Sequence, residues 1–191
     1  MLYGIVYCGG EHRSCEVKKI KTIEVPFLGE RSVLVKYKVN VYTGTYNGTP
    51  YIFLSNDRFF DINPHENNPS AQDGCYVLNR SGINEVERFA FFSKAVYVLL
   101  KTLCSEGVKG LDCPNVVIAN DWHLGALSGL MKYFTTAQVE AKMMDAELAE
   151  KIRKIPVVHI AHHLGYQGWD YDNTVKMPRR LKTAIRGQPT H

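Results

Sequence analysis

Two short apolar runs in the second half of the chain constrain the fold most. Residues 115–119 read Asn-Val-Val-Ile-Ala and residues 157–160 read Val-Val-His-Ile, and each run is bounded by turn-favouring residues. Runs of this length and composition are typical of buried strands. Residues 124–134 and 137–154, which lie between them, carry apolar side chains at helical spacing, so we expect two helices there. A strand, helices and a strand in this order predict a βαβ unit with parallel strands and a right-handed crossover.

The first third of the chain has a different pattern. Residues 2–7, 33–39 and 51–54 are rich in β-branched and aromatic side chains with partial alternation, which favours strands. Asn47-Gly48 lies between the second and third of these runs. This dipeptide is a strong hairpin signal, because both residues tolerate a positive φ.

A long helix is predicted between the two parts. Residues 85–104 place apolar side chains on one stripe with a period of about 3.6 residues. Before this helix, residues 56–81 are rich in Asn, Asp, Pro, Gly and Ser, which indicates a long surface loop. The predicted fold class is α/β, a Rossmann-like parallel sheet with helices, preceded by a β-rich segment. We expect one partial domain over residues 1–191, with a β-rich part (1–55), a loop (56–82), a βαβ part (83–170) and an unassigned tail (171–191).

Charge and hydropathy exclude several classes of protein. The formal net charge is +4, and the basic groups at residues 18–21 and 179–180 are typical of a solvated surface rather than of a nucleic-acid interface. No apolar stretch approaches the roughly 18 residues that a membrane span requires, and residues 1–8 lack the features of a signal peptide. We therefore expect a soluble, cytoplasmic protein.

The cysteines point to the same location. They are odd in number and contain no Cys-x-x-Cys pair; they are Cys8, Cys15, Cys75, Cys104 and Cys113. This pattern predicts neither a disulfide framework nor a zinc ribbon, so we expect reduced thiols.

Polar residues directly follow both predicted buried strands. Residues 120–123 (Asn-Asp-Trp-His) come after the first strand, and residues 162–168 (His-His-Leu-Gly-Tyr-Gln-Gly) come after the second. Ligands of open parallel sheets bind outside the carboxyl ends of the strands, so neighbouring strands would bring both segments to one crevice. Asp121 also has a structural alternative, since it stands where it would cap the following helix.

Other site chemistries find little support in the sequence. His159, His162 and His163 lie close together and His123 could join them, but their spacing matches no zinc motif. There is no glycine-rich dinucleotide fingerprint, no phosphate-binding loop and no nucleophile elbow. We expect neither a metal nor a cofactor.

Four segments in the same order resemble the glycogen and starch synthases that use ADP-glucose. They are residues 87–95 (Glu-Arg-Phe-Ala-Phe-Phe-Ser-Lys-Ala), 117–123 (Val-Ile-Ala-Asn-Asp-Trp-His), 156–158 (Pro-Val-Val) and 162–168. In that family the helix reads Arg-Phe-x-x-Phe-x-(Arg/Lys)-Ala, the first strand ends in His-Asp-Trp-His, and the second ends in His-Asn-Leu-x-Tyr-Gln-Gly. Phe59-Phe60-Asp61 resembles the segment before the family's variable loop, so the resemblance covers residues 50 to 170.

The resemblance implies the N-terminal half of a two-domain GT-B fold and a retaining transfer of glucose that needs no metal. The implied donor is a nucleotide sugar, ADP-glucose or UDP-glucose, and the implied acceptor is the non-reducing end of an α-1,4-glucan. His162 would lie against the transferred glucose, and Asp121 would line the sugar with it, as the catalytic pair. The residues implied to bind substrate are Trp122, His123, His163, Tyr166 and Gln167. No nucleic acid or membrane partner is implied.

The sequence departs from the family pattern at several places. His163 stands where the family has Asn, and neither the family's Lys-Thr-Gly-Gly loop nor the half that holds the diphosphate is present. We therefore expect a fragment that is inactive alone. The alternative is a non-catalytic glucan-binding or regulatory relative. Strand edges left unpaired in such a fragment would allow self-association.

Overall fold

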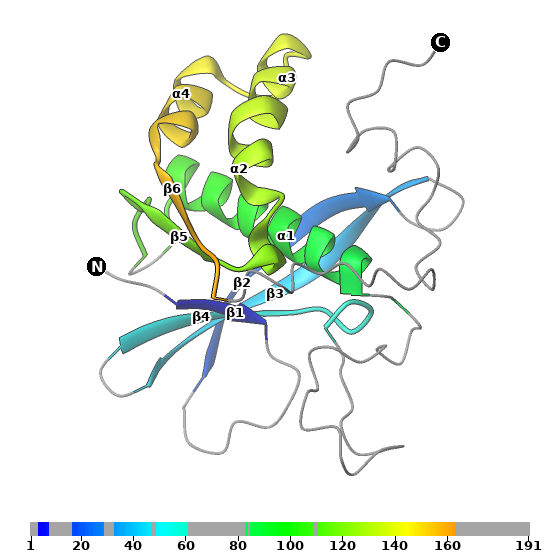
Figure 1. Ribbon diagram of the computed structural model, residues 1–191, viewed down its shortest axis with the longest axis vertical. Coiled ribbons are helices and arrows are strands. Elements are labelled where there is room, and N and C mark those ends of the chain that lie inside the picture. The colour runs from blue at the N-terminus through cyan, green and yellow to red at the C-terminus, as the bar shows by residue number, and fades with distance from the viewer. Residues whose placement is uncertain are drawn as a thin grey trace.

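The computed structural model describes residues 4–7, 17–28, 33–46, 49–60, 83, 85–108 and 111–162 (Figure 1). These residues form a mixed α/β structure. The strands are β1 (Gly4–Tyr7), β2 (Lys18–Leu28), β3 (Leu34–Tyr46), β4 (Thr49–Ser55), β5 (Val117–Asn120) and β6 (Val157–Ile160). The helical elements are α1 (Glu85–Ser105), the 3-10 turn η2 (Trp122–Leu124), α2 (Leu127–Gly129), the π-helical turn η3 (Leu130–Phe134), α3 (Thr135–Glu140) and α4 (Ala146–Lys154).

Two sheets are present in the described residues. The first has the order β1-β4-β3-β2, with β1 parallel to β4 and the other pairs antiparallel. Tyr46 pairs with Thr49, which confirms the predicted hairpin, although Asn47 and Gly48 themselves lie outside the described residues. The second sheet is the parallel pair of β5 and β6, as the βαβ pattern predicted.

Strand β2 was not predicted from the sequence. Its alternation is real, since Ile23 and Val25 are buried while Thr22 and Glu24 are exposed. Lysines at one end and Pro26 near the other conceal this pattern in the sequence. Both features suit the outermost strand of a sheet, where lysine and proline discourage pairing with another chain.

Helix α1 is the centre of the molecule. It contacts β2 of the first sheet as well as η2, α2 and α4, and Figure 1 shows it between the sheet and the other helices. Nearly every residue from Arg88 to Leu100 is buried, including the polar Ser93 and Lys94. The helix predicted over residues 85–104 is therefore confirmed. The prediction placed its apolar residues on one stripe, but the helix is buried on all sides, as is typical of a helix in the core of a domain.

An aromatic cluster joins the first sheet to α1. The rings of Phe59 and Phe91 stack with centroids 3.8 Å apart, and Phe27 and Tyr37 contact both rings edge-on. Asn56 fixes the turn that presents Phe59, because its Oδ1 accepts a hydrogen bond of 3.0 Å from the Phe59 backbone N–H. Edge-on and stacked pairs of this kind stabilise a core beyond their buried area. The Phe-Phe segment singled out in the sequence is therefore a packing element.

The connection from β5 to β6 is helical but divided differently from the prediction. One continuous run of helical turns covers residues 127–140, so the first helix extends beyond residue 134. The single helix predicted over residues 137–154 is wrong. The chain leaves the helix after Glu140, and Lys142 adopts a left-handed conformation with φ 56°.

Asp145 starts the last helix. Its Oδ1 accepts hydrogen bonds from the backbone N–H groups of Glu147 (2.9 Å) and Leu148 (3.1 Å), which is the geometry of an N-cap. Helix α4 then buries Ala149 and Ile152 against the core.

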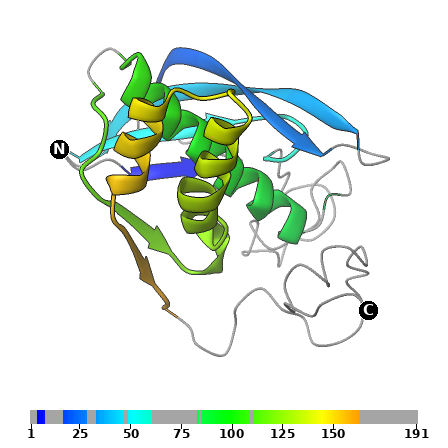
Figure 2. The ribbon, with the colours of Figure 1, turned by 90° about the horizontal axis from the view of Figure 1, so that it is seen from above.

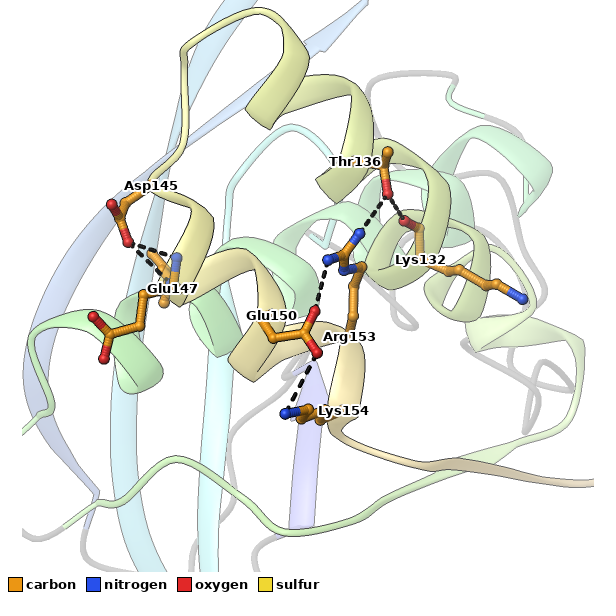
Figure 3. A network of polar contacts seen from close by, with 8 residues as sticks. Lys132, Thr136, Asp145, Glu147, Glu150, Arg153 and Lys154 are labelled. Atoms are coloured by element: carbon orange, nitrogen blue, oxygen red, sulfur yellow. Dashed lines mark hydrogen bonds and ion pairs between the residues drawn. The ribbon is translucent and has the colours of Figure 1, made fainter.

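A polar network covers the outer side of α4 (Figure 3). Glu150 pairs with Arg153 at 2.6 Å and with Lys154 at 3.4 Å, and Arg153 also donates to Thr136 Oγ1 of α3 at 3.3 Å. Exposed ion pairs contribute about 0–1 kcal/mol each. The buried side chain of Ile152, at 0% exposure, therefore holds α4 in place more than these pairs do.

A disulfide between Cys104 and Cys113 corrects the expectation of reduced thiols. Helix α1 ends at Ser105, Gly107 turns the chain at φ 67°, and Val108 bridges to Leu111. This reversal brings the two Cα atoms to 4.5 Å, within the range a disulfide requires. A count of cysteines cannot reveal it, because the proximity is produced by the turn.

The pair of β5 and β6 has an open face, so the prediction that both strands are buried is wrong: only Ala119 of β5 and no residue of β6 is buried. Ala119 is fully buried, whereas Ile118, Val158 and Ile160 are 40–48% exposed. Side chains at these alternate positions point away from the helices that cover the other face. None of the helices in the described residues is long and apolar enough to cross a membrane.

Candidate functional site

The carboxyl ends of β5 and β6 meet at one rim. The strands are parallel and in register, with Asn120 beside Ile160, and the backbone N–H of Asp121 donates to the carbonyl of Ile160 at 2.8 Å. The two segments singled out in the sequence therefore leave the sheet next to each other, as the strand pairing predicted. Figure 2 shows β5 and β6 at the edge of the helical layer.

Asp121 and His162 are in direct contact. The carboxylate Oδ1 of Asp121 accepts a hydrogen bond of 2.7 Å from the backbone N–H of His162. The expectation that Asp121 caps the next helix is wrong, since its side chain makes no capping hydrogen bond to η2. The carboxylate instead fixes the first residues after β6.

Asp121 also has an unusual backbone conformation. Its φ is 52° and its ψ is −167°, a region that is essentially restricted to glycine. Such a conformation costs about 1–3 kcal/mol and persists only where the surrounding structure imposes it. Here the hydrogen bonds at both its backbone N–H and its carboxylate impose it. Strain of this kind is concentrated at functional sites.

Asn120 completes the contacts of His162 within the described residues. Its Oδ1 lies 3.0 Å from Nε2 of the His162 ring, and both side chains are exposed. Sequence reasoning did not assign Asn120 to the site. The available signal was its place directly before Asp121 at the predicted end of β5.

Trp122 and His123 turn inward instead. Their rings stack with centroids 4.8 Å apart, and both contact Phe89 of α1 edge-on, at 4.7 Å and 4.4 Å. Burial lowers the pKa of His123 from its ordinary value, while the charge of Asp121 opposes this shift. The Ser93 hydroxyl donates to the His123 carbonyl at 3.3 Å. This packing fixes the strand end against α1, so each ring is only partly accessible.

His159 contacts a different residue from His162. Its Nε2 lies 2.5 Å from the hydroxyl of Ser128 on α2, and its register neighbour is the buried Ala119. Among the described histidines, His159 and His162 therefore have separate partners. Within the described residues no group of three His, Cys, Asp or Glu side chains is placed to hold a metal ion.

The rim offers a particular set of groups. The carboxylate of Asp121 contacts the backbone N–H of His162 and the amide of Asn120 contacts the His162 imidazole, on residues that are exposed or partly exposed. These groups accept and donate hydrogen bonds to hydroxyl-rich ligands, and the carboxylate adds a negative charge.

Comparison with known proteins identifies the relationship. The starch synthase catalytic domain family matches residues 5–185 of the chain. The chain belongs to this family. The resemblance drawn from the four sequence segments is thereby confirmed.

Comparison with two relatives shows what share of a full-length member of this family the chain covers. A glycogen synthase from Finegoldia magna (strain ATCC 29328 / DSM 20472 / WAL 2508) is 27% identical over 139 residues, which cover 72% of this chain and 22% of the relative. The catalytic domain of starch synthase IV from Arabidopsis thaliana, solved with ADP and acarbose bound, matches with a TM-score of 0.52 and 19% identity. That match covers 87% of this chain and 30% of the solved chain, and it shows a shared fold. The chain thus spans about a fifth of the glycogen synthase's length.

Part of the predicted site lies beyond the described residues of this starch synthase relative. His163, Tyr166 and Gln167 follow His162 in the chain, and the structure describes residues only as far as His162 at this end. Their assigned roles stay predictions. Among the predicted residues that are described, Asp121 and His162 are brought together, while Trp122 and His123 adjoin them on the side of α1.

Proposed function

We propose that this chain is part of a retaining glucosyltransferase of the glycogen and starch synthase type. In this proposal the complete enzyme transfers glucose from ADP-glucose or UDP-glucose to an α-1,4-glucan. The observation that carries the proposal is the contact between Asp121 and His162 at the joint rim of β5 and β6, in a member of the starch synthase family. The ADP and acarbose in the starch synthase IV structure support a nucleotide-sugar donor and a glucan acceptor.

The proposed roles follow from the charge that develops in the reaction. Breaking the bond between glucose and a diphosphate builds positive charge on the sugar ring and negative charge on the leaving group. Fixed dipoles and charges stabilise such a state when they are positioned in advance. His162 would contact the sugar, and the carboxylate of Asp121 would hold the His162 backbone and contribute negative charge beside the ring.

The remaining predicted residues would complete the sugar site. Trp122 and His123 would line it from the side of α1, where a ring face suits the C–H surface of a sugar. His163, Tyr166 and Gln167 are assigned to substrate binding by the family resemblance alone. We assign no metal and no cofactor to the reaction.

We further propose that the chain contributes the N-terminal half of a GT-B fold and is inactive alone. The matched relatives extend far beyond the region that this chain matches, since it covers 22% of the glycogen synthase and 30% of the starch synthase IV chain. A cleft between two domains needs both of them, so the complete protein is the proper subject of an activity assay.

The test replaces His162 by Ala in the complete protein. Glucose transfer to glycogen is measured with ADP-glucose and separately with UDP-glucose, and the free energy of unfolding is measured in parallel. We expect kcat to fall by about 100-fold or more, as for the loss of a group that stabilises the transition state. The free energy of unfolding should change by less than about 0.5 kcal/mol, because the side chain is exposed.

His159→Ala is the matched control. His159 lies on the same strand end but contacts Ser128 rather than the rim. This variant should retain its kcat. If His162→Ala lost stability and activity together, or kept its kcat, the sugar-contacting role would be wrong.

A second candidate function is a non-catalytic glucan-binding or regulatory module. The presence of His163 where the family has Asn favours it, because an amide that both donates and accepts has been replaced by an imidazole. Binding of the chain to immobilised α-glucan, combined with no glucose transfer by the complete protein, would decide for this alternative.

Location and association complete the proposal. We propose a cytoplasmic protein. In that compartment cellular reductants would open the Cys104–Cys113 disulfide, which forms under oxidising conditions. Self-association through strand edges is also proposed. The edge at β2 is poorly suited to it, since Lys18, Lys19 and Pro26 protect that strand.

A further inference from the structure

His162 is held at two points by two consecutive residues of β5 and the turn after it. Asp121 binds its backbone N–H through a hydrogen bond of 2.7 Å, and Asn120 contacts its ring nitrogen Nε2 through Oδ1 at 3.0 Å. The first contact fixes where the residue lies. The second restrains how the ring is turned.

The chemistry of the amide oxygen decides the position of the proton. A carbonyl oxygen only accepts hydrogen bonds, so the nitrogen that faces it must carry hydrogen. A neutral imidazole has one N–H and one lone pair. With the hydrogen on Nε2, the lone pair lies on Nδ1 and is available to a donor such as a hydroxyl group.

We propose that Asn120 is a positioning residue that holds His162 as the Nε2-protonated tautomer and directs the Nδ1 lone pair toward a sugar hydroxyl. The identity of this ligand rests on the proposed function. The tautomer and its cause do not, because they follow from the contact between Asn120 and His162. Asn120 would act on the substrate only through His162.

An uncharged partner is part of the arrangement. A carboxylate in place of the Asn120 amide would favour the doubly protonated imidazolium, in which both nitrogens are donors and neither accepts. An amide fixes the tautomer without adding this bias. Asp121, an acidic group at the rim, gives one carboxylate oxygen to the His162 backbone N–H.

The His159 contact supplies an internal comparison. Its Nε2 faces the Ser128 hydroxyl, and a hydroxyl both donates and accepts, so this contact does not select a tautomer. The two histidines are three residues apart in one chain. Under identical conditions, one therefore shows the effect of a hydroxyl partner and the other the effect of an amide oxygen on the tautomer.

The first experiment measures the tautomer directly. Two-bond nitrogen–proton NMR spectra of the complete protein, labelled with 15N at histidine, are recorded at a pH where the imidazoles are neutral, and the His162 signals are assigned by their loss in His162→Gln. We expect a single Nε2-protonated species. In Asn120→Leu the nitrogen shifts should move to the averaged values of a histidine in a short peptide, while those of His159 stay unchanged. In the control Ser128→Ala, only the His159 signals should move.

Two results would overturn the proposal. One is a wild-type His162 that is protonated on Nδ1 or already shows the averaged shifts. The other is an Asn120→Leu variant in which the His162 shifts do not change although Ser128→Ala moves those of His159.

The second experiment asks whether the tautomer matters to the reaction of the complete protein. Loss of one hydrogen bond of ordinary strength predicts that Asn120→Leu lowers kcat about tenfold. Asn120→Asp keeps an oxygen in place but favours the imidazolium, so the acidic limb of its kcat–pH profile should move to higher pH. A merely structural residue would not move the pH profile. If the complete protein transferred no glucose at all, the proposed function would fail, and the NMR result would still decide the tautomer.

Discussion

Lys94 lies inside the protein on α1, with its ammonium group 3.3 Å from the centre of the Phe134 ring and 5.3 Å from that of Tyr97. Only 9% of the residue is exposed. Burial lowers the pKa of Lys94 from 10.5 to about 8, and the charge of Lys101 adds to the shift. The aromatic faces offset part of the cost of burying the charge, by about 2 kcal/mol or more for a desolvated cation.

This shift predicts how the stability depends on pH. The folded-state pKa is below the unfolded value, so between pH 8 and 10.5 the unfolded chain binds more protons and the free energy of unfolding rises with pH. Below pH 8 Lys94 is charged in the folded protein, and the full cost of burying this charge lowers the free energy of unfolding. Lys94→Met removes this dependence. As the pH rises from 8 to 10, the free energy of unfolding of the wild type should increase by roughly 1–3 kcal/mol relative to that of the variant. Urea unfolding from pH 7 to pH 10 measures it.

Lys132→Met is the control for this measurement. Lys132 is exposed and lies 5.5 Å from the Tyr133 ring, so its replacement should leave the pH dependence unchanged. Burial also raises the pKa of Tyr97, which lowers stability above pH 10 and is why the range stops there. Parallel curves for wild type and Lys94→Met would show that the buried ammonium is not the cause.

At the rim, residues were predictable from the sequence where their position depends only on which strands are neighbours. The segments that hold Asp121 and His162 were found because each follows an apolar strand, and neighbouring parallel strands end together; the family resemblance then singled out the two residues. The structural role of Asp121 was mistaken, since its position before a helical turn suggested a cap while its carboxylate bonds to a residue 41 positions later. Asn120 was missed for the same reason: its partner is remote in sequence.

Among the elements, the C-terminal end of α1 depends on long-range support. Its last turn contains no basic residue, and the ammonium group of Lys151 on α4 donates to the carbonyl of Cys104 at 3.0 Å. A cation at this position offsets the partial negative charge of a helix C-terminus. The disulfide from Cys104 to Cys113 closes the chain directly behind it.

Removing this disulfide should loosen the end of α1. For a closed loop of about ten residues, the entropy lost from the unfolded chain corresponds to about 2–3 kcal/mol of stability. We expect Cys113→Ser to lower the free energy of unfolding by this amount under oxidising conditions. Dithiothreitol should produce the same loss in the wild type and make the thiols of Cys104 and Cys113 accessible to alkylation, and it should lower the stability of Cys113→Ser less than that of the wild type. If dithiothreitol did not change the free energy of unfolding of the wild type, the stabilising role of the Cys104–Cys113 disulfide would be wrong.

Elements with one dominant pattern were predictable from sequence and the others were not. Helix α1 and strands β5 and β6 were recognised because their apolar residues have a clear period or form an uninterrupted run. Strand β2 was hidden by its lysines. The break between α3 and α4 was hidden because Lys142 adopts a left-handed conformation that its residue type disfavours.

On the scale of the whole molecule, the open face of the β5–β6 pair stands out. Parallel strands are normally covered on both faces, yet Val116, Ile118, Val158 and Ile160 are 40–48% exposed. An apolar patch of this kind promotes aggregation when nothing covers it. We expect the chain produced alone to have low solubility for this reason.

Val158→Lys tests this expectation. A charge in the middle of the open face should raise the concentration at which the chain stays monomeric by several-fold, measured by light scattering and sedimentation, without changing its circular dichroism. Met143→Lys is the control, because Met143 is 70% exposed but lies between α3 and α4, away from this face. Equal improvement in both variants would point to net charge rather than to the face itself.

The hydrogen bond from the His162 backbone to the Asp121 side chain also has a consequence for the order of folding. Its two partners lie at the ends of different strands, so it cannot form in a chain that has yet to align β5 with β6. The contorted backbone at Asp121 has no support before that moment and would relax to an ordinary conformation. The groups proposed to handle the sugar are thus brought together only after β5 and β6 have paired, and a molecule in which these strands are still apart would present no competent site to donor or glucan.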